Sequence, residues 1–186
     1  ISNNLALNIL KCHNNHLEAL DVTKHTGLDT LVCSKNKLKM LSVVHNSRLV
    51  HLNCSGNQLS VIDVSRNPSM LIFRCAENQL TSVDVSLNTK LEVLDCSWNL
   101  LQQIDVSRNQ ALTDLAIRGN RIADIDISKN LSLYRLSCAD NQLAFVDVMK
   151  NRKLKILESA PMVTLQTLFC PRDPVYKKPV PYTHLT

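Results

Sequence analysis

The sequence has few of the residues on which several classes of protein depend. Of its 186 residues only 3 are glycine, and Phe, Trp and Tyr together make up 4%. Nucleic-acid-binding proteins combine basic clusters with aromatic side chains on which bases stack. Here aromatic residues are scarce and the net charge is a modest +5. We therefore expect no nucleic-acid partner.

Long apolar runs are absent as well. None approaches the roughly 20 residues that a membrane-spanning helix needs, so we expect no membrane insertion. The opening residues, ISNNLALNIL, have neither the basic segment nor the cleavage site of a secretory signal peptide. The chain also starts without Met and in the middle of a repeat. This start predicts a piece of a longer protein, and it does not indicate the compartment.

The main feature that the sequence does contain is a repeat of 21 residues. Cysteine stands at positions 12, 33, 54, 75, 96 and 138, and Ile117 takes the one missing place in this series. Asn comes three residues after each of these positions, from Asn15 to Asn141. A fixed period of this size is typical of a solenoid, in which each repeat forms one coil. Complete units occupy residues 7–27, 28–48, 49–69, 70–90, 91–111, 112–132 and 133–153.

Each unit has two similar halves. The first reads L-x-x-L-x-C-x-x-N-x-L, as in residues 28–38, and the second reads L-x-x-L-D-V-S-x-N, as in residues 59–67, where Ile62 replaces the second Leu. Apolar residues two apart mark a short strand in each half, and the Asn that follows closes a turn. The sequence therefore predicts a β-rich solenoid over residues 1–157, with parallel strands, two short strands per coil and little helix.

These two motifs resemble the leucine-rich repeat consensus. The nested second half makes the chain similar to the bacterial 21-residue subclass known as IRREKO. The resemblance covers residues 1–157, and it implies a parallel β-solenoid that binds other macromolecules in an extracellular, cell-surface or secreted setting. The chain lacks the paired-proline motif of the family's type III effector subclass, which argues against a ubiquitin-ligase effector.

Residues 158–186 leave the repeat pattern and hold five of the six prolines. The end of a solenoid exposes apolar core and an unpaired strand edge, so it needs a cap. We expect a short cap at about 160–170 and a proline-rich tail or linker after Pro171. The residues expected to cover the last coil are Met162, Val163, Leu165, Leu168 and Phe169.

Six of the seven cysteines share one column of the repeat, so in a solenoid they stack about 4.8 Å apart. Equivalent residues on neighbouring parallel strands have parallel Cα–Cβ bonds, which suits disulfide geometry badly. Reduced cysteine packs as a small buried hydrophobe, and the closely spaced cysteine pairs of a zinc site are absent. We therefore expect a ladder of free core thiols, with an occasional disulfide or a metal site as the alternatives.

Three polar columns are too regular to form a specific site. The Asn columns, Asn15 to Asn141 and Asn46 to Asn151, are expected to bond to turn backbone. The Asp column, Asp21 to Asp147, would place like charges on neighbouring strands. A basic column three residues further on, Lys24 to Lys150, with Ser and Thr hydroxyls between the two columns, is expected to compensate these charges on a solvated face. A row of bound cations is the alternative.

No catalytic site, metal or cofactor is expected. His13 and His16 lie close to Cys12 in sequence, but Cys12 should point inward and His13 outward. This arrangement disfavours both a shared metal and a Cys–His catalytic pair. Cys170, which lies outside the ladder, is interpreted as a cap or tail thiol, with a reactive thiol beside Arg172 as the alternative. We therefore expect a protein that is not an enzyme.

The outer face of the first-half strands varies from coil to coil, whereas the second-half face repeats Asp and Ser. Variable exposed columns are free to serve a ligand. Trp98, the one Trp of the chain, should lie near the middle of this face among Arg74, Arg118 and Arg135, and Trp and Arg are enriched in interface hot spots. Packing of Trp98 over the neighbouring turn is the alternative. The predicted binding surface comprises His51, Asn53, Arg74, Val93, Asp95, Trp98, Arg118 and Arg135.

The sequence is therefore interpreted as a non-catalytic protein-binding module, the recognition domain of a bacterial surface or secreted protein. It is expected to bind a protein partner, as a monomer or with flanking domains at its ends. The alternatives are a structural spacer or adhesin stalk that touches glycans, and the substrate-recognition domain of a larger secreted effector.

Overall fold

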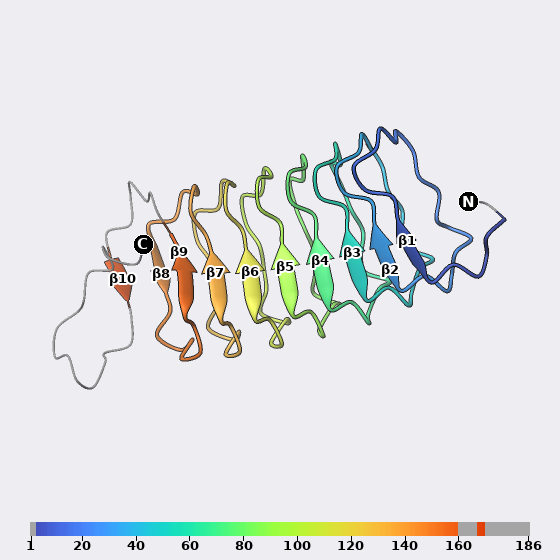
Figure 1. The fold of residues 1–186 in the computed structure, drawn as a ribbon. Helices are drawn as coiled ribbons and strands as arrows, with labels where there is room; N and C mark the ends of the chain where they lie inside the picture. Colours follow the sequence, from blue (N-terminus) through green and yellow to red (C-terminus); the bar gives the residue numbers. More distant parts are fainter. Residues whose placement is uncertain (1–2, 160–166, 170–186) are drawn as a thin grey trace.

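The computed structural model describes residues 3–159 and 167–169. These residues form a solenoid of short strands and turns without a helix, as Figure 1 shows. None of them therefore belongs to a helix that could cross a membrane. The strands are β1 (Ile9–Lys11), β2 (Thr30–Val32), β3 (His51–Asn53), β4 (Ile72–Arg74), β5 (Val93–Asp95), β6 (Asp114–Ala116), β7 (Arg135–Ser137), β8 (Phe145–Asp147), β9 (Ile156–Glu158) and β10 (Thr167–Phe169).

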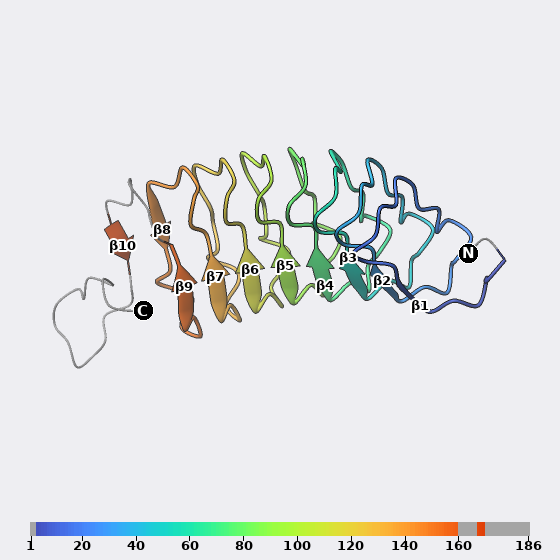
Figure 2. The same ribbon diagram turned by 45° about the horizontal axis from the view of Figure 1, so that its top comes forward.

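Eight of the strands form one parallel sheet in the order β1-β2-β3-β4-β5-β6-β7-β9. Each residue pairs with its equivalent 21 positions later, as Leu31 pairs with Leu52 and Leu52 with Phe73. Figure 2 shows the strands side by side in chain order. Because all coils have the same length, each column of the sequence becomes a straight row across the sheet. The predicted parallel solenoid is confirmed.

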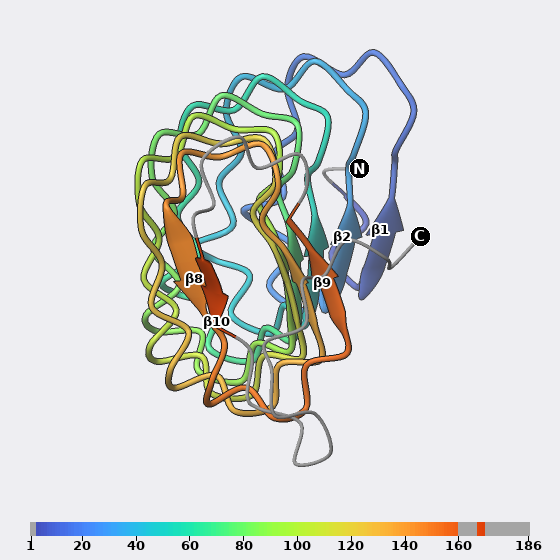
Figure 3. The same cartoon turned by 90° about the vertical axis from the view of Figure 1, so that its left-hand side faces the viewer.

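The second halves of the coils differ from the prediction of two strands per coil. Among the described residues, only β8 forms a strand there, and it pairs with β10. Figure 3, a view along the coils, shows β8 and β10 on the side opposite the main sheet. Elsewhere the second halves share few inter-coil backbone bonds, such as Gln58 N–H to the Leu38 carbonyl at 2.9 Å. Side-chain amides take the place of a continuous ladder.

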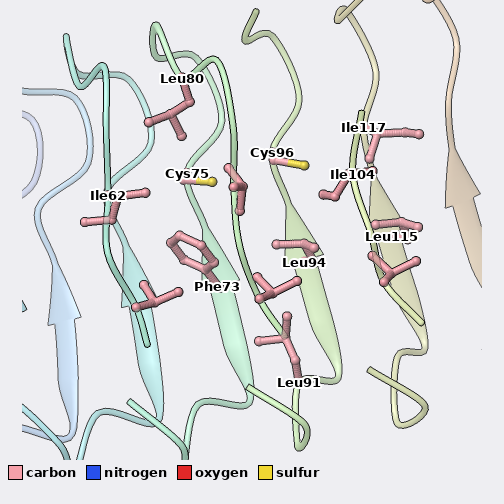
Figure 4. Packing of buried hydrophobic residues seen from close by; sticks show 14 of the residues in the cluster. Ile62, Phe73, Cys75, Leu80, Leu91, Leu94, Cys96, Ile104, Leu115 and Ile117 are labelled. Carbon is pink, nitrogen blue, oxygen red and sulfur yellow. The ribbon is translucent and has the colours of Figure 1, made fainter. Parts of the chain in front are cut away.

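Apolar side chains from both halves fill the interior of every coil. The central residue of each strand from β2 to β7 is buried, and Phe73 is the largest of the fully buried side chains. In Figure 4, Phe73 and Cys75 of one coil lie beside Leu94 and Cys96 of the next, within a single continuous core. Burying a side chain of this size contributes about 1.5–3 kcal/mol. The core therefore joins the coils into one stack.

The cysteine column forms the predicted ladder of free thiols from Cys12 to Cys138. Five of these six thiols are buried and Cys12 is half-buried. The Sγ atoms of Cys54 and Cys96 each lie 3.6 Å from a carbonyl oxygen of the next coil. Burial raises the pKa of Cys54 and of Cys138 to about 12, so both stay protonated at neutral pH. Cys170 lies outside the described residues.

The first Asn column bonds each coil to its neighbour. Asn99 Nδ2 donates to the carbonyls of Cys75 and Cys96, each at 3.1 Å, and its Oδ1 accepts the Leu80 N–H at 3.0 Å. The same pattern holds from Asn36 to Asn141. These side chains therefore satisfy buried backbone groups of two coils at once.

The second Asn column donates but leaves its oxygens without a partner. Asn109 Nδ2 donates to the Val85 and Asn88 carbonyls at 2.9 Å, whereas its buried Oδ1 has no hydrogen-bond partner. The same holds for every member of this column from Asn46 to Asn151. The prediction that Asn bonds turn backbone is confirmed for both columns. The positive backbone angles of the turns, however, fall on other residues.

The charges of the Asp column are stabilised mainly by the Ser and Thr residues next to it, and less by the basic column than predicted. Each carboxylate accepts the backbone N–H two residues on, as Asp105 accepts that of Ser107 at 2.8 Å. This bond and the bond from the Ser107 hydroxyl lower the pKa of Asp105, and the charge of Arg108 adds less. No carboxylate of this column forms an ion pair within the described chain. Local hydrogen bonds, more than the basic column, stabilise these charges.

The predicted cap at about 160–170 falls outside the described residues except for the backbone of β10. There β10 adds a parallel strand next to β8, with Leu168 in register with Val146. On the main sheet β9 is the last strand, next to β7. The proline-rich tail after Pro171 lies outside the described residues.

Candidate binding face

The outer face of the main sheet carries six of the eight predicted binding residues. The first and third residues of each strand point away from the core, and from β2 to β6 they are half-buried. The constant register places His51, Val93 and Arg135 in one row and Asn53, Arg74 and Asp95 in the next. Residues far apart in the sequence therefore lie on a single continuous face.

A row of turn residues borders this face three positions after each strand. We call this row the rim. All its members have a positive φ, between 53° and 67°. This conformation costs a residue with a Cβ roughly 1–2 kcal/mol, yet five of the seven members are not glycine. The coils therefore keep varied side chains at the rim in spite of backbone strain. The rim comprises Asn14, Lys35, Gly56, Glu77, Trp98, Gly119 and Asp140.

Trp98 belongs to the rim and is 50% exposed. One side of its ring lies over the turn of the next coil, where a Cβ at Gly119 would be 2.3 Å from Trp98 Cε3. The guanidinium carbon of Arg118 lies 5.4 Å from the ring centroid. The expected alternative, packing over a neighbouring turn, is thus present together with substantial exposure. The ring is held in place and still offers a free surface.

Arg118 is fixed from both sides. Its Nε donates to Asp140 Oδ2 at 2.8 Å, while its guanidinium faces the Trp98 ring. Both partners are partly exposed, so the ion pair adds little stability, about 0–1 kcal/mol. Its main effect is to orient the guanidinium. Trp98, Arg118 and Asp140 together form a connected line across three coils.

The other two arginines expected near Trp98 form no cation–π pair with its ring within the described chain. Arg135 in β7 pairs instead with Glu158 in β9, at 2.8 Å between Nη2 and Oε1. Arg74 in β4 forms no ion pair with any described residue. The arginines therefore lie on the same face as Trp98, but only Arg118 supports it directly.

His51 is half-buried in β3, and its Nε2 atom is buried without a hydrogen-bond partner. Burial lowers the pKa of His51, and the nearby charges of Arg74 and Lys11 lower it further. The imidazole is therefore neutral at pH 7. Within residues 3–159, no group of three or more His, Cys, Asp or Glu side chains could hold a metal ion.

Sequence reasoning missed several residues of this face. Asp140 and Glu158 orient Arg118 and Arg135, and Gly119 makes room for the indole. The ammonium of Lys155 lies over the ring of Tyr134, just before β7, at 5.6 Å from the ring centroid. The sequence held one signal for the packing of the indole. Gly119 stands one full unit after Trp98, so the residue next to the ring in the following coil has no side chain.

No family model matches the chain, and no curated protein matches it in sequence. Solved structures do match. The functional domain of InlJ from Listeria monocytogenes, described as including a cysteine ladder, is 36% identical to the chain with a TM-score of 0.78. The LRR protein LIC12759 of Leptospira interrogans is 19% identical with a TM-score of 0.76. The chain belongs to the leucine-rich repeat family.

This leucine-rich repeat chain matches only part of these proteins. The alignments cover 85% and 81% of the chain, but 40% of the InlJ domain and 42% of the Leptospira protein. A third structure is the ectodomain of the plant receptor kinase GASSHO1/SCHENGEN3 from Arabidopsis thaliana, in complex with CASPARIAN STRIP INTEGRITY FACTOR 2. It is 20% identical over 82% of the chain and 21% of the receptor, with a TM-score of 0.72, and shows the fold alone. Membership of the IRREKO subclass stays a prediction.

Proposed function

We propose that this leucine-rich repeat domain is a non-catalytic module that binds a protein partner. The proposed surface is the outer face of β3 to β7 with the adjacent rim. It comprises His51, Asn53, Arg74, Val93, Asp95, Trp98, Arg118 and Arg135.

The main support for this proposal is that Trp98 is half exposed and yet held in one position. Its side chain is half exposed, its backbone has a φ of 53°, and its ring is held by Gly119 and Arg118. A smaller residue or glycine would suit the coil better at this position. An aromatic ring that is already fixed loses little conformational entropy when a partner covers it, and such rings are typical hot spots.

The structural neighbours support the same class of function. The InlJ match is a domain described as functional, and the plant receptor ectodomain is in complex with CASPARIAN STRIP INTEGRITY FACTOR 2. From the InlJ likeness we propose a recognition domain in a bacterial surface or secreted protein. Residues 1–157 would form the recognition solenoid, and residues 158–186 would form its cap and tail.

The test is capture of partners by the immobilised chain from the exposed and secreted proteins of the source cells. We expect one or more proteins that the wild type retains and that both Trp98→Ala and Arg118→Glu lose. Arg66→Glu is the matched control, because Arg66 is exposed on the second-half side of the coil. Thermal unfolding of each variant verifies the fold. Equal capture by both face variants would refute this surface, and no specific capture would favour a structural spacer.

A further inference from the structure

The two glycines of the rim each lie next to a long side chain of the preceding coil. Gly56 and Gly119 each stand one coil after a long side chain of the rim, Lys35 and Trp98. A Cβ at Gly56 would lie 3.2 Å from Lys35 Cγ, and one at Gly119 would lie 2.3 Å from Trp98 Cε3. Gly27, the remaining glycine, lies outside the rim and has no positive φ, and a Cβ there would lie 3.3 Å from Asn8 Oδ1. Each rim glycine therefore provides a bare turn beside the rim residue of the preceding coil.

Only the base of the Lys35 side chain lies against Gly56, whereas the whole edge of the Trp98 ring lies against Gly119. Lys35 and Trp98 occupy the same column of the repeat, three coils apart. At the spacing of neighbouring strands, this separation is about 14 Å along the solenoid. The rim therefore presents one exposed cation and one held aromatic ring whose backbones are a fixed distance apart.

Further positive charge lies on the outer face of the neighbouring strands, where Lys11 is in register with Val32 of β2 and Arg74 with Asn53 of β3. Lys11 in β1 and Arg74 in β4 both act on His51 in β3, because the charge of each lowers the pKa of His51. We call Lys11, Lys35, His51 and Arg74 the basic cluster. Lys11 and Lys35 are exposed and Arg74 is half-buried.

The charges of the basic cluster are not matched by ion pairs. The two ion pairs of the described chain, Arg118–Asp140 and Arg135–Glu158, both lie beyond Trp98. Asp95 is the register partner of Arg74 on the neighbouring strand. It forms no ion pair there, and its Oδ1 accepts the Ser97 N–H at 3.1 Å. Glu77 on the rim and Asp29, whose carbonyl accepts the His51 N–H at 3.0 Å, are the other nearby acids, and both are also without an ion pair in the described chain.

We propose that the basic cluster binds an acidic segment of the protein partner, while Trp98, which is three coils from Lys35 and one coil from Arg74, binds an apolar side chain of the same partner. This inference rests on the proposed function and specifies the chemistry of the partner. Lys and Arg form strong charge-assisted hydrogen bonds with carboxylates. Complementary charge also fixes the register of a complex and speeds its formation. A cluster of three cations matches a short run of carboxylates.

The test uses the whole chain and defined peptides. The probe has three glutamates, a four-residue Gly/Ser spacer and a leucine, since four extended residues span about 14 Å. A second peptide replaces the glutamates with lysines. Because Trp98 is the one Trp, its fluorescence reports binding at the rim, and the anisotropy of a dye on the peptide gives the affinity.

We expect the acidic peptide to bind and the lysine peptide not to bind. Lys35→Glu and Arg74→Glu should each weaken the acidic peptide about tenfold or more, whereas Arg66→Glu should have no effect. Gly56→Ala should also weaken binding, because it displaces Lys35 without removing its charge. Gly27→Ala is the matched glycine control.

Equal affinity for the two peptides, no binding of the acidic peptide, or an equal loss with Arg66→Glu would overturn the inference. Tighter binding of heparin, lost in the same two variants, would replace an acidic polypeptide with an anionic polysaccharide. Failure of the peptide test together with Trp98-dependent capture of a protein would leave the proposed function standing and refute only the acidic segment.

Discussion

The indole ring of Trp98 covers the turn at Gly119 in the next coil so closely that a Cβ on Gly119 would lie 2.3 Å from the ring atom Cε3. The ring therefore keeps its place because Gly119 has no side chain. Arg118, one residue before the glycine, lies 5.4 Å from the ring centroid. The position of the proposed hot spot in one coil is thus determined by two residues of the following coil.

Substitution of Gly119 should therefore move Trp98. Gly119→Ala is expected to lift the ring, which shifts the Trp emission to longer wavelength and increases its quenching by acrylamide. It should also lower the free energy of unfolding by about 1–3 kcal/mol, because Ala at a positive φ is strained and meets the ring.

A double-mutant cycle separates these two costs. In a Trp98→Ala background, Gly119→Ala should retain the backbone cost but lose the clash, and a smaller loss of stability is expected there. An emission spectrum unchanged by Gly119→Ala would contradict the observed packing of the ring.

The buried thiols should react only when the chain unfolds. In a Cys170→Ser background at pH 8, iodoacetamide is expected to label Cys12 first, because that thiol is half-buried. Burial raises the pKa of Cys54 and Cys138 to about 12, so almost no thiolate is present there. Urea without reductant should expose all six ladder thiols to labelling. A requirement for reductant, detected by mass spectrometry, would show a disulfide in place of the free ladder.

The two Asn columns should differ in their importance for stability. Asn99→Ala removes bonds to four backbone groups of two neighbouring coils. Asn109→Ala removes bonds to two carbonyls and also removes an oxygen that lacked a partner. We expect losses of about 3 kcal/mol for Asn99→Ala and about 2 kcal/mol for Asn109→Ala. Urea unfolding measures both variants. The reverse order would mean that the unpartnered oxygens do not destabilise the coil.

The Asp column should make the domain sensitive to acid. Hydrogen bonds from the turns lower the pKa of Asp84, Asp105 and Asp126 in the folded state. A depressed folded pKa adds stability above the ordinary pKa of about 3.9, and this stability is lost as pH falls through the lower folded value.

The urea midpoint should therefore fall below about pH 4 and fall less in the triple Asp→Asn variant, whose amide oxygens can still accept the turn N–H. Asp29→Asn is the control, because Asp29 lies outside the Asp column. Identical pH profiles for the wild type and the triple variant would show that these carboxylates do not couple acid to unfolding.

The stacking of the coils was predictable from the sequence because a constant repeat length puts equivalent residues of neighbouring coils next to each other. The 21-residue spacing placed every cysteine from Cys12 to Cys138 in one inward-facing row and every Asn from Asn36 to Asn141 against turn backbone. Both rows were found as predicted. Periodicity reports burial directly, since one column of a repeat meets the same environment in every coil.

The missing second strands could not be predicted in this way. Alternating apolar residues such as Ile62 and Val64 are both buried, as in a half-buried strand, but the alternation does not show whether neighbouring backbones bond to each other. The sequence also left open which residues stabilise the carboxylates of the Asp column. Ser107 and Arg108 are adjacent, and either could stabilise Asp105. Only the geometry assigns the larger effect to Ser107.

The details of the candidate face depend on side-chain placement that a column alignment does not contain. The alignment placed Trp98 on the variable face, but it did not show which arginine meets the ring. Arg118 does so, and its orientation depends on Asp140 in the next coil. Whether this face binds a partner stays a prediction that the capture experiment tests.

The constant 21-residue register has a consequence for how such a domain changes over generations. A coil gained by recombination between repeats at the boundary of residues 90 and 91 would leave the basic cluster and the Trp98 turn intact. It would change only the distance between them, by one strand spacing of about 4.8 Å. Partner specificity could then shift in whole steps of length, without the substitution of a single contact residue.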